Sequence, residues 1–328
     1  MASTKSFPGV LIQEIGGHRG VMEEHVDFLK MRFSLITMKE FQENKEELAE
    51  KILCIFVWGA KPEIDYKLLK SLPKLKVIVN SGVGVDHLDL QLISSLGVKL
   101  ANTPDAVSNA TADTAMMLLL ASARNVLQGY QIAVSPQTEH FTLNWVSEEV
   151  TGATLGIIGM GRIGYKIAER AKAFEMKILY HNRNQRLEEE RAVGASYCKS
   201  LGDLLQQPDF VLLAVPLTQD TQKLIGKKEL QLMKPSATLI NISRGLVVDQ
   251  MALVEALQNG DIRAAALDVT YPEPLPRDHQ LLKLSNVILT PHIGSATRST
   301  RRIMMETMVQ SMLDAVAGRQ VSNEVITQ

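Results

Sequence analysis

The chain alternates short, nearly all-apolar runs with segments of helical periodicity along almost its whole length. Strands that are buried on both faces need such runs, because neither side of the strand meets water. Strands that are separated by helices connect through crossovers and therefore pair in parallel. The sequence thus predicts an α/β protein built from doubly wound parallel sheets.

The apolar runs fall into two series, and each series predicts one sheet. The first series ends near Asn102 and consists of GVLIQEI, FSLIT, CIFVWG, KVIVNSG and VKLAN. The second begins at Thr154 and consists of TLGIIGMG, KILYHN, FVLLAVP, ATLINIS, RAAALDV and VILTP. A length of 328 residues also favours two domains over one.

Two long helical patterns lie where one series gives way to the other. Residues 106–127 predict one helix and residues 295–318 predict another, and both are placed to bridge the domains. The first domain is then discontinuous, with residues 1–104 plus 297–328, and the second spans 105–296. Within the second, residues 129–154 have no clear period and carry Trp145, which predicts a functional arm or a surface loop.

Composition excludes several classes of protein. Apolar residues make up 45% and charged residues 22%, and 35 basic residues face 36 acidic ones, so no basic excess points to nucleic acid or to anionic membrane. Cys54 and Cys198 lie far apart, which fits neither a disulfide framework nor a metal site. The first ten residues lack the apolar core of a signal peptide, and no apolar run is long enough to span a bilayer. We expect a cytoplasmic protein.

A glycine-rich loop follows the first strand of the second series. Gly159, Gly161 and Gly164 form G-x-G-x-x-G between the apolar run TLGII and a helical pattern. In a dinucleotide site, such glycines permit a tight turn, let the backbone approach a pyrophosphate and let the helix pack on the strand. Glycines also occur in purely structural turns, but here the strand and the helix are both in place.

The next strand lacks the acid that usually follows this loop. A ribose-binding Asp or Glu is expected about twenty residues after the glycines, at the end of KILYHNRN, where His181 stands. Asn182, Arg183 and Asn184 offer donors to a 2′-phosphate instead. The pattern favours NADP(H), with NAD(H) as the weaker alternative, over an exposed basic turn without a ligand.

Three polar motifs each follow a strand of the second series. Arg244 lies in NISRGLVVDQ, Glu273 in YPEPLP and His292 in LTPHIGSAT. Ligands of open α/β sheets bind beyond the carboxyl ends of the strands, so these side chains and Asp268 are predicted to converge. Each residue alone is equally well explained as a cap, a solvated charge or a surface turn.

Together the three side chains suit the reduction of a 2-keto acid. A protonated imidazole can deliver a proton to a carbonyl oxygen as hydride reaches the carbon. A carboxylate on the other ring nitrogen orients the histidine, and an arginine can grip the substrate carboxylate with two hydrogen bonds. In the first domain, Gly82, Val83 and Gly84 predict a nest of backbone N–H groups for the same carboxylate, or a plain glycine turn.

These motifs resemble those of the D-isomer-specific 2-hydroxyacid dehydrogenase family. The fragments SGVGVDHLDL, TLGIIGMGRIGYKIAERAKAF, LLAVPLTQDTQKLIGKKELQLMKPSATLINISRGLVVDQMALVEAL, GDIRAAALDVTYPEPLP and NVILTPHIGSAT carry the resemblance, which covers nearly the whole chain. It implies a Rossmann dinucleotide-binding domain and a smaller flavodoxin-like substrate domain. ILYHNRN and HIGSAT are most similar to the glyoxylate reductase/hydroxypyruvate reductase branch.

The resemblance also assigns roles to individual positions. Its catalytic set falls on Arg244, Glu273 and His292. It implies that Arg162 and Ile163 contact the pyrophosphate. The contacts on the nicotinamide side are implied to be Pro216, Ile242, Asp268 and Gly294. The substrate contacts are implied to be Val83, Gly84, Arg244, His292 and Ser295. The family implies a homodimer that pairs through the arm 129–154, and whether Trp145 enters a partner's pocket stays open.

The expected function is therefore the NADPH-dependent reduction of small 2-keto acids, glyoxylate and hydroxypyruvate, with His292 as the general acid. An inactive paralogue that serves only as a scaffold is disfavoured by the intact set of Arg244, Glu273 and His292, and two further alternatives remain. One is a reductase of another 2-keto acid, such as a sugar-derived one. The other is a dinucleotide-sensing, corepressor-like binding module, which the non-acidic HNRN motif disfavours.

Overall fold

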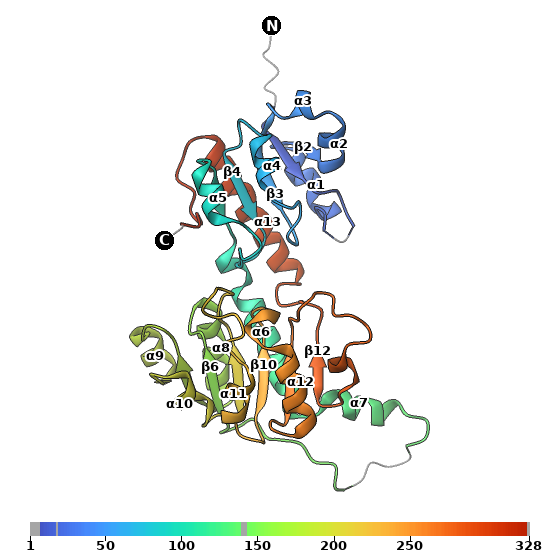
Figure 1. Ribbon diagram of the computed structural model, residues 1–328, viewed down its shortest axis with the longest axis vertical. Helices are drawn as coiled ribbons and strands as arrows, with labels where there is room; N and C mark the ends of the chain where they lie inside the picture. Colours follow the sequence, from blue (N-terminus) through green and yellow to red (C-terminus); the bar gives the residue numbers. More distant parts are fainter. Residues whose placement is uncertain (1–6, 18, 139–142, 327–328) are drawn as a thin grey trace. The chain divides into compact units, whose positions relative to one another are not determined.

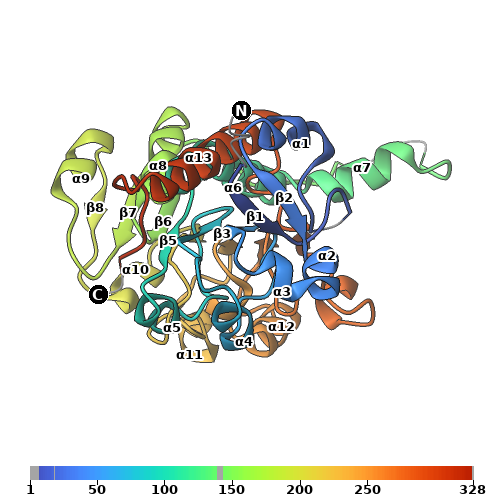
Figure 2. The ribbon, with the colours of Figure 1, turned by 90° about the horizontal axis from the view of Figure 1, so that it is seen from above.

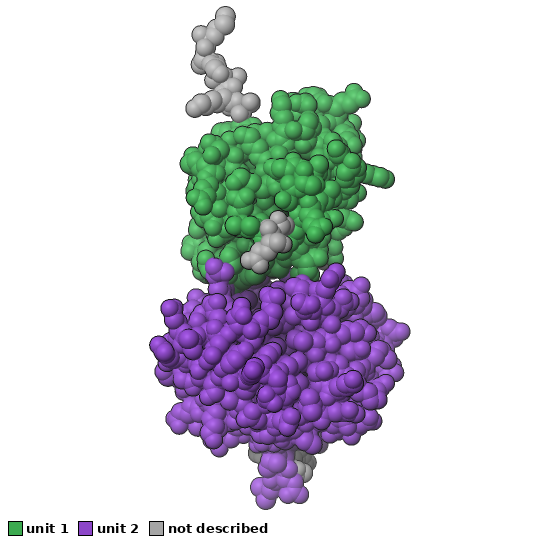
Figure 3. Space-filling model, turned by 60° about the vertical axis from the view of Figure 1, so that its left-hand side comes forward, with its two compact units in different colours: residues 1–107, 297–328 green, residues 108–296 purple. Residues whose placement is uncertain are grey.

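The computed structural model of the protein describes residues 7–17, 19–138 and 143–326. The chain forms two compact units, one of residues 1–107 with 297–328 and one of residues 108–296 (Figure 3). The first unit is therefore discontinuous in sequence.

The first unit is a five-stranded parallel sheet with the strand order β2-β1-β3-β4-β5. Its elements are β1 (Gly9–Ile12), α1 (Glu23–Lys30), β2 (Ser34–Thr37), α2 (Met38–Glu43), α3 (Lys45–Leu48), β3 (Ile52–Val57), α4 (Tyr66–Lys70), β4 (Val77–Asn80), α5 (Leu90–Ser95), β5 (Lys99–Ala101) and α13 (Arg298–Val316) (Figure 1). This is the flavodoxin-like order, with its reversal between β1 and β3.

Alternate residues of these strands enter two separate cores. Val10 and Ile12 of β1 pack with α1 and α13, whereas Leu11 packs with α2, α4 and α5 on the other face. Figure 2 shows α1 and α13 on one side of this sheet and α4 and α5 on the other. The all-apolar strand sequence follows from this two-sided burial.

The second unit is a seven-stranded parallel sheet with the order β12-β11-β10-β9-β6-β7-β8. Its strands are β6 (Thr154–Ile158), β7 (Lys177–His181), β8 (Ser196–Tyr197), β9 (Phe210–Leu213), β10 (Thr238–Asn241), β11 (Ala264–Leu267) and β12 (Val287–Leu289). Its remaining helices are α7 (Val126–Val134), α8 (Arg162–Ala173), α9 (Leu187–Val193), α10 (Leu201–Leu205), α11 (Lys227–Leu232), η1 (Gly245–Val247), α12 (Gln250–Asn259) and η2 (Gln280–Lys283), while α6 (Pro104–Ala123) begins in the first unit.

This strand order is that of a Rossmann fold with one strand added beyond β11. The order reverses between β6 and β9, which is where such a sheet binds its ligand. The predicted fold class is confirmed. The two-residue β8 was not predicted, because so short a strand leaves no period in the sequence.

The faces of the second sheet are covered by different sets of helices. Leu155 and Ile157 of β6 share a core with α6 and α8. Val211 and Leu213 of β9 share the opposite core with α10, α11 and α12. The carboxyl edge of the sheet is thereby left for the loops that follow each strand.

The prediction of one helix over residues 106–127 is wrong. The helix ends at Ala123 and a second one, α7, begins at Val126. Asn125 between them has φ +49°, in the left-handed region, which interrupts the helical backbone. Asparagine tolerates this conformation better than most residues, so the apolar periodicity on either side hid the break.

The predicted arm is partly helical, because α7 extends from Val126 to Val134. Beyond residues 139–142, which lie outside the described part, the chain returns to the junction between α6 and α7. There Arg124 Nε donates to Ser147 Oγ at 3.0 Å, and Glu148 N donates to the Ala123 carbonyl at 2.9 Å. The Trp145 ring lies beside Gly129, where a Cβ atom would be 3.5 Å from Cη2.

The second bridging helix, predicted over residues 295–318, spans Arg298–Val316 and packs on β3, β4 and β5 of the first unit. Thr297 caps it by accepting a hydrogen bond from Thr300 N at 3.1 Å. Across the described ranges 7–17, 19–138 and 143–326, none of the helices combines the length and apolar character needed to cross a membrane.

Candidate active site

The glycine loop joins β6 to α8 as predicted from its sequence. Gly159 has φ +106°, which a residue with a side chain rarely adopts. A Cβ atom on Gly164 would collide with the Gly159 carbonyl oxygen, so this position requires glycine for the helix to pack on the strand. The space beside Gly161 is open, and the first turn of α8 begins there at Arg162 and Ile163. Open space beside a helix N-terminus suits a pyrophosphate.

Two hydrogen bonds tie this loop to the end of β7. Gly159 N donates to the His181 carbonyl at 3.1 Å, and Met160 N donates to Asn182 Oδ1 at 2.7 Å. The carboxamide oxygen of Asn182 therefore holds the glycine loop in place. Arg183 and Asn184 follow it and are exposed to solvent.

The other predicted cofactor contacts lie after neighbouring strands. Pro216 follows β9 and is exposed, and its carbonyl accepts a hydrogen bond from Thr221 Oγ1 at 2.6 Å. Ile242 follows β10 and is largely buried in the core that contains α6 and α8. Both lie at the carboxyl edge of the sheet, close to the reversal of strand order.

The turn that carries Arg244 is organised by Asn241, the buried last residue of β10. Asn241 Oδ1 accepts hydrogen bonds from Ser243 N and Ser243 Oγ, at 3.0 and 2.7 Å, and its Nδ2 donates to the Arg244 carbonyl at 2.9 Å. A Cβ atom on Gly245 would collide with the Thr270 backbone. The Arg244 turn thus packs directly on the loop that carries Glu273.

Glu273 and His292 form a hydrogen-bonded pair. Glu273 Oε2 lies 2.9 Å from His292 Nδ1, and Glu273 Oε1 accepts a hydrogen bond from Thr270 N at 3.0 Å. Burial by itself would raise the pKa of the Glu273 carboxyl, but these two hydrogen bonds and the charges of His292 and Arg244 together hold that pKa below its usual value. The carboxylate is therefore ionised at neutral pH and acts as the acceptor, so His292 Nδ1 is the donor.

The loop that carries His292 is held by the buried carboxylate of Asp268. Asp268 Oδ1 accepts hydrogen bonds from Thr290 Oγ1 and Ile293 N, at 2.6 and 2.8 Å, and Oδ2 accepts one from Gly294 N at 2.9 Å. Both carboxylate oxygens are thus engaged within the site's own loops. Ser295, which comes next, is half-buried.

His292 itself has φ +55°, in the left-handed region. Its backbone N–H donates to the Asp268 carbonyl at 2.8 Å, which holds the residue in this conformation. Such a backbone costs on the order of 1–3 kcal/mol and is found mostly where the surrounding structure fixes a functional side chain.

The second unit therefore brings three distant motifs together at one edge of its sheet. The Arg244 turn contacts Thr270, Thr270 binds Glu273, and Glu273 binds His292. Among the described residues, the His292 ring is hydrogen-bonded through Nδ1 alone, and the Arg244 turn lies beside the pair. Such an arrangement can orient a proton donor beside a carboxylate-bearing carbonyl compound.

The predicted carboxylate loop belongs to the first unit and follows β4. Its carbonyls are tied down, since Asn102 Nδ2 donates to the Val83 carbonyl at 2.8 Å and Asn80 Nδ2 to the Gly84 carbonyl at 3.0 Å. The expectation that Gly82 also presents its N–H group is wrong, because Gly82 N donates to Thr103 Oγ1 at 2.8 Å. The predicted nest is thus reduced to the N–H groups of Val83 and Gly84.

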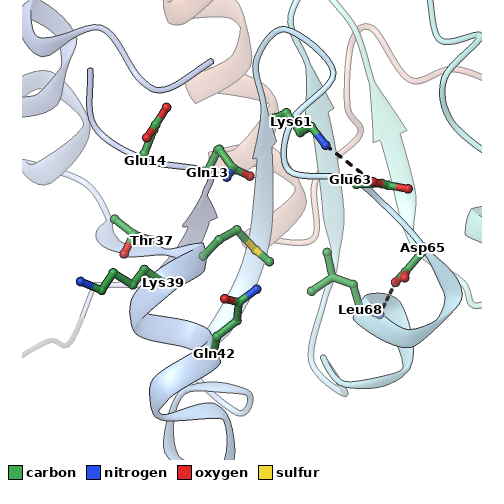
Figure 4. A pocket seen from close by; sticks show the side chains of 10 residues that line it. Gln13, Glu14, Thr37, Lys39, Gln42, Lys61, Glu63, Asp65 and Leu68 are labelled. Carbon is green, nitrogen blue, oxygen red and sulfur yellow. Dashed lines mark hydrogen bonds and ion pairs between the residues drawn. The ribbon is translucent and has the colours of Figure 1, made fainter. Parts of the chain in front are cut away.

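A polar pocket of about 630 Å³ lies elsewhere in the first unit, at the carboxyl ends of β1, β2 and β3 (Figure 4). Its charged lining is partly paired, because Lys61 Nζ lies 3.6 Å from Glu63 Oε2 and Asp65 accepts a hydrogen bond from Leu68 N. It is lined by Gln13, Glu14, Thr37, Met38, Lys39, Gln42, Lys61, Glu63, Asp65 and Leu68. None of the predicted site residues lies in it.

The side chains that position these loops were not predicted from the sequence. Asn80 and Asn241 are the clearest cases, since each is the buried last residue of an apolar strand and holds the loop that follows. Asparagine ending an all-apolar run, in VIVN and TLIN, is the signal that was available. A buried amide at that point must find partners, and the nearest ones are the backbone groups of the next turn.

Comparison with known proteins decides the family. The model for the NAD-binding domain of D-isomer-specific 2-hydroxyacid dehydrogenases matches residues 116–294, which include the glycine loop and all three motifs. The chain belongs to the D-isomer-specific 2-hydroxyacid dehydrogenase family. It is an oxidoreductase of that family with a nicotinamide dinucleotide cofactor.

Several relatives of this dehydrogenase span almost its full length. A glyoxylate reductase from Pyrococcus furiosus is 40% identical over 303 residues, covering 90% of each chain. A glyoxylate/hydroxypyruvate reductase B from an Enterobacter species is 42% identical over 301 residues, covering 90% of this chain and 92% of its own. Among solved structures, an NADPH-dependent glyoxylate/hydroxypyruvate reductase from Sinorhizobium meliloti, in complex with NADP and malonate, is similar with a TM-score of 0.86 and 31% identity, covering 98% and 97% of the two chains.

Proposed function

We propose that this dehydrogenase reduces glyoxylate and hydroxypyruvate to the corresponding 2-hydroxy acids with NADPH, and that His292 is the general acid. The observation that carries the proposal is the 2.9 Å hydrogen bond between Glu273 and His292, beside the turn that carries Arg244. Two relatives that cover 90% of the chain support it, one named a glyoxylate reductase and the other a glyoxylate/hydroxypyruvate reductase.

The roles of the side chains follow from their contacts. Glu273 keeps the Nδ1 proton of His292 in a hydrogen bond, so the Nε2 proton of the imidazolium is the one delivered to the substrate oxygen. Arg244 grips the substrate carboxylate and polarises the adjacent carbonyl. The bound cofactor supplies the hydride that reaches the carbonyl carbon. Ser295, two residues after Ile293 in the same loop, completes the carboxylate site of this unit.

The residues at the glycine loop fit a phosphorylated dinucleotide. Gly159, Gly161 and Gly164 shape the loop, and the first turn of α8 directs its N–H groups to the pyrophosphate. Pro216, Ile242, Asp268 and Gly294 line the nicotinamide side. Arg183 and Asn184, after β7, receive the 2′-phosphate of NADPH, and NADH serves as a weaker alternative because nothing acidic there binds its free 2′-hydroxyl.

A panel of 2-keto acids assayed with both cofactors tests this function. We expect glyoxylate and hydroxypyruvate to give the highest kcat/KM, and NADPH to exceed NADH. A higher kcat/KM on a sugar-derived keto acid would mean that the enzyme catalyses the proposed reaction on a different substrate. Binding of dinucleotide without turnover of any keto acid would contradict the enzyme and favour a sensing module.

We further propose that two copies pair through the arm formed by α7 and residues 143–154. This surface exposes a run of large apolar side chains that a single copy leaves in water, namely Val126, Leu127, Tyr130, Val134, Leu143 and Val146. Patches of this kind on a folded unit are typical of interfaces. Trp145 packs against Gly129 of its own arm, which stiffens the surface offered to the second copy.

A reducing compartment, the cytoplasm, suits the two thiols. Cys54 and Cys198 are both free and buried. Burial raises the pKa of Cys198 and raises the pKa of Cys54 to about 12, so neither thiol is a ready nucleophile. Retention of full activity after prolonged exposure to thiol reductant is the expected result.

A further inference from the structure

The segment after β7 is hydrogen-bonded to a buried tyrosine that has no role in the proposed mechanism. Tyr180 is fully buried in β7, yet its hydroxyl has two partners in the segment that follows. It accepts a hydrogen bond from Arg186 N at 3.0 Å and donates one to Glu190 Oε2 at 2.9 Å. Residues 182–186 are here called the basic loop. The Tyr180 hydroxyl therefore fixes the backbone N–H of the last residue of this loop, Arg186.

The same glutamate binds a second part of the basic loop. Gln185 Nε2 donates to Glu190 Oε2 at 2.8 Å, next to the bond from Tyr180. Burial and the neighbouring Glu190 raise the pKa of Tyr180 to about 12, so the phenol keeps the proton that it donates. The Tyr180 hydroxyl therefore stays protonated across the pH range of an ordinary assay and can both donate to Glu190 and accept from Arg186 there.

The start of the basic loop is anchored separately. Tyr197 Oη donates to the Asn182 carbonyl at 3.0 Å, and the Tyr197 ring packs on Tyr180 with centroids 5.3 Å apart. Asn182 Oδ1 accepts from Met160 N of the glycine loop. Anchors at both ends leave only Arg183 and Asn184 between them, exposed on a short span of fixed backbone.

The charges around the basic loop leave Arg183 as its available cation. The Arg186 side chain is engaged by Glu189, with Nε 3.0 Å from Oε1. Within the described part of the chain, Arg183 has no carboxylate partner. A guanidinium on a fixed backbone loses less conformational entropy on binding a phosphate than one on a mobile loop.

We propose that Tyr180 is a positioning residue for cofactor selection, whose hydroxyl holds the basic loop in the shape in which Arg183 and Asn184 bind a 2′-phosphate. The inference rests on the proposed preference for NADPH. Tyr180 is fully buried and its hydroxyl is bonded to Arg186 and Glu190, so we expect it to act only through the basic loop and only on ligands that carry the 2′-phosphate.

Tyr180→Phe, which removes only the hydroxyl, is the test. Direct titration with adenosine 2′,5′-bisphosphate and with 5′-AMP measures the preference without turnover. We expect the variant to bind the bisphosphate about five- to tenfold more weakly, as loss of two hydrogen bonds implies, and to bind 5′-AMP unchanged. The KM for NADPH should rise by the same factor, while kcat and the KM for NADH stay the same.

Tyr165→Phe is the matched control, because it removes the same group from α8 of the same unit, outside these contacts. Glu190 supplies a second comparison. Glu190→Gln keeps an oxygen that accepts from both Tyr180 and Gln185 and should retain the preference, whereas Glu190→Ala should reproduce Tyr180→Phe. If Tyr180→Phe also loses 5′-AMP binding because it misfolds, the comparison of Glu190→Gln with Glu190→Ala tests the proposal in its place.

The outcomes separate the two proposals. A wild-type protein that binds both nucleotides equally would overturn the NADPH preference and this inference together. A wild-type protein that prefers the bisphosphate, with Tyr180→Phe or Glu190→Ala keeping the same ratio, would overturn the inference alone. A change in the KM for NADH equal to that for NADPH would show a structural role only.

Discussion

At the scale of single residues, the site depends on side chains that hold one another. Glu273 orients His292 through a 2.9 Å hydrogen bond, and His292 keeps a backbone conformation with φ +55° that its neighbours impose. The His292 and Glu273 side chains are 46% and 37% exposed, so their placement comes from hydrogen bonds and backbone contacts more than from apolar packing. We therefore expect substitutions of these residues to affect the chemistry first.

Replacing His292 with asparagine should remove the proton donor and keep a polar group of similar reach. We expect turnover to fall by about 10²–10⁴-fold, the range of general acid catalysis, with cofactor binding intact. Single-turnover measurements with saturating NADPH check this. Turnover within a few-fold of wild type would assign the proton to another group.

Replacing Arg183 with aspartate should reverse the cofactor preference. The new carboxylate repels a 2′-phosphate and accepts a hydrogen bond from a free 2′-hydroxyl. We expect kcat/KM for NADPH to fall by about 10- to 100-fold, as loss of a charged hydrogen bond implies, while that for NADH rises. Arg191→Asp, in the last turn of the neighbouring helix α9, is the control. Equal losses for both cofactors would argue against a role in selection.

The Glu273 carboxylate should also make stability depend on pH. Its pKa is lowered in the folded protein, so its contribution is complete above the unfolded value of about 4.3 and is lost as the pH falls through the lower folded pKa. Tm measured from pH 6 down to pH 3 should therefore fall less steeply for Glu273→Gln than for wild type. Parallel curves below pH 4.3 would mean that the carboxylate is not stabilised in the fold.

At the scale of elements, the loops that carry the site are fastened to the helices and strands beside them. The first residue of α12, Gln250, pairs with both backbone groups of Tyr271: its Nε2 donates to the carbonyl at 2.8 Å and its Oε1 accepts from the N–H at 3.0 Å. This clamp holds the loop two residues before Glu273. Asn241 and Asp268 hold the neighbouring loops in the same manner.

Replacing Gln250 with leucine should loosen the Glu273 loop without touching the cofactor site. We expect kcat to fall by about ten- to a hundredfold, because small misplacements of a proton donor are costly, with the KM for NADPH unchanged. Gln258→Leu, on the same helix and bonded to Gln280 at the surface, should behave as wild type. Unchanged kcat in Gln250→Leu would show that His292 and Arg244 hold Glu273 without the clamp.

At the scale of the whole molecule, each unit is a doubly wound sheet whose loops follow the carboxyl ends of the strands. The discontinuous unit is closed by α13, which returns from the second unit to pack on β3, β4 and β5. The arm of the second unit carries several large apolar side chains, among them Leu127, Tyr130 and Leu143, that the fold of a single copy leaves exposed.

Charged substitutions on the arm should separate the proposed dimer. Leu127→Glu with Tyr130→Glu places two carboxylates in the patch, and we expect light scattering at micromolar concentration to show a monomer, against a dimer for wild type. Met251→Glu is the control, because Met251 is equally exposed but lies on α12. A monomeric wild-type protein would contradict the proposal.

The sequence by itself determined the class of fold, the glycine loop and the motifs after the strands of the second sheet. These features are local: a strand buried on both faces must be apolar, and a loop against a pyrophosphate must be glycine. It also placed Arg244, Glu273 and His292 at strand ends, since parallel strands share a carboxyl edge. A long apolar period concealed the break at Asn125, because one left-handed residue leaves no trace in the pattern.

Only the tertiary structure decided which polar groups meet. Tyr180 finds Arg186 and Glu190, and Gln250 finds Tyr271 across loops that no sequence period relates. Asn182 Oδ1 accepts a hydrogen bond from the glycine loop, a contact that the sequence did not predict, while donation from its Nδ2 to a phosphate stays a prediction. Such contacts depend on distances of about 3 Å between separate elements, which packing sets and sequence patterns do not encode.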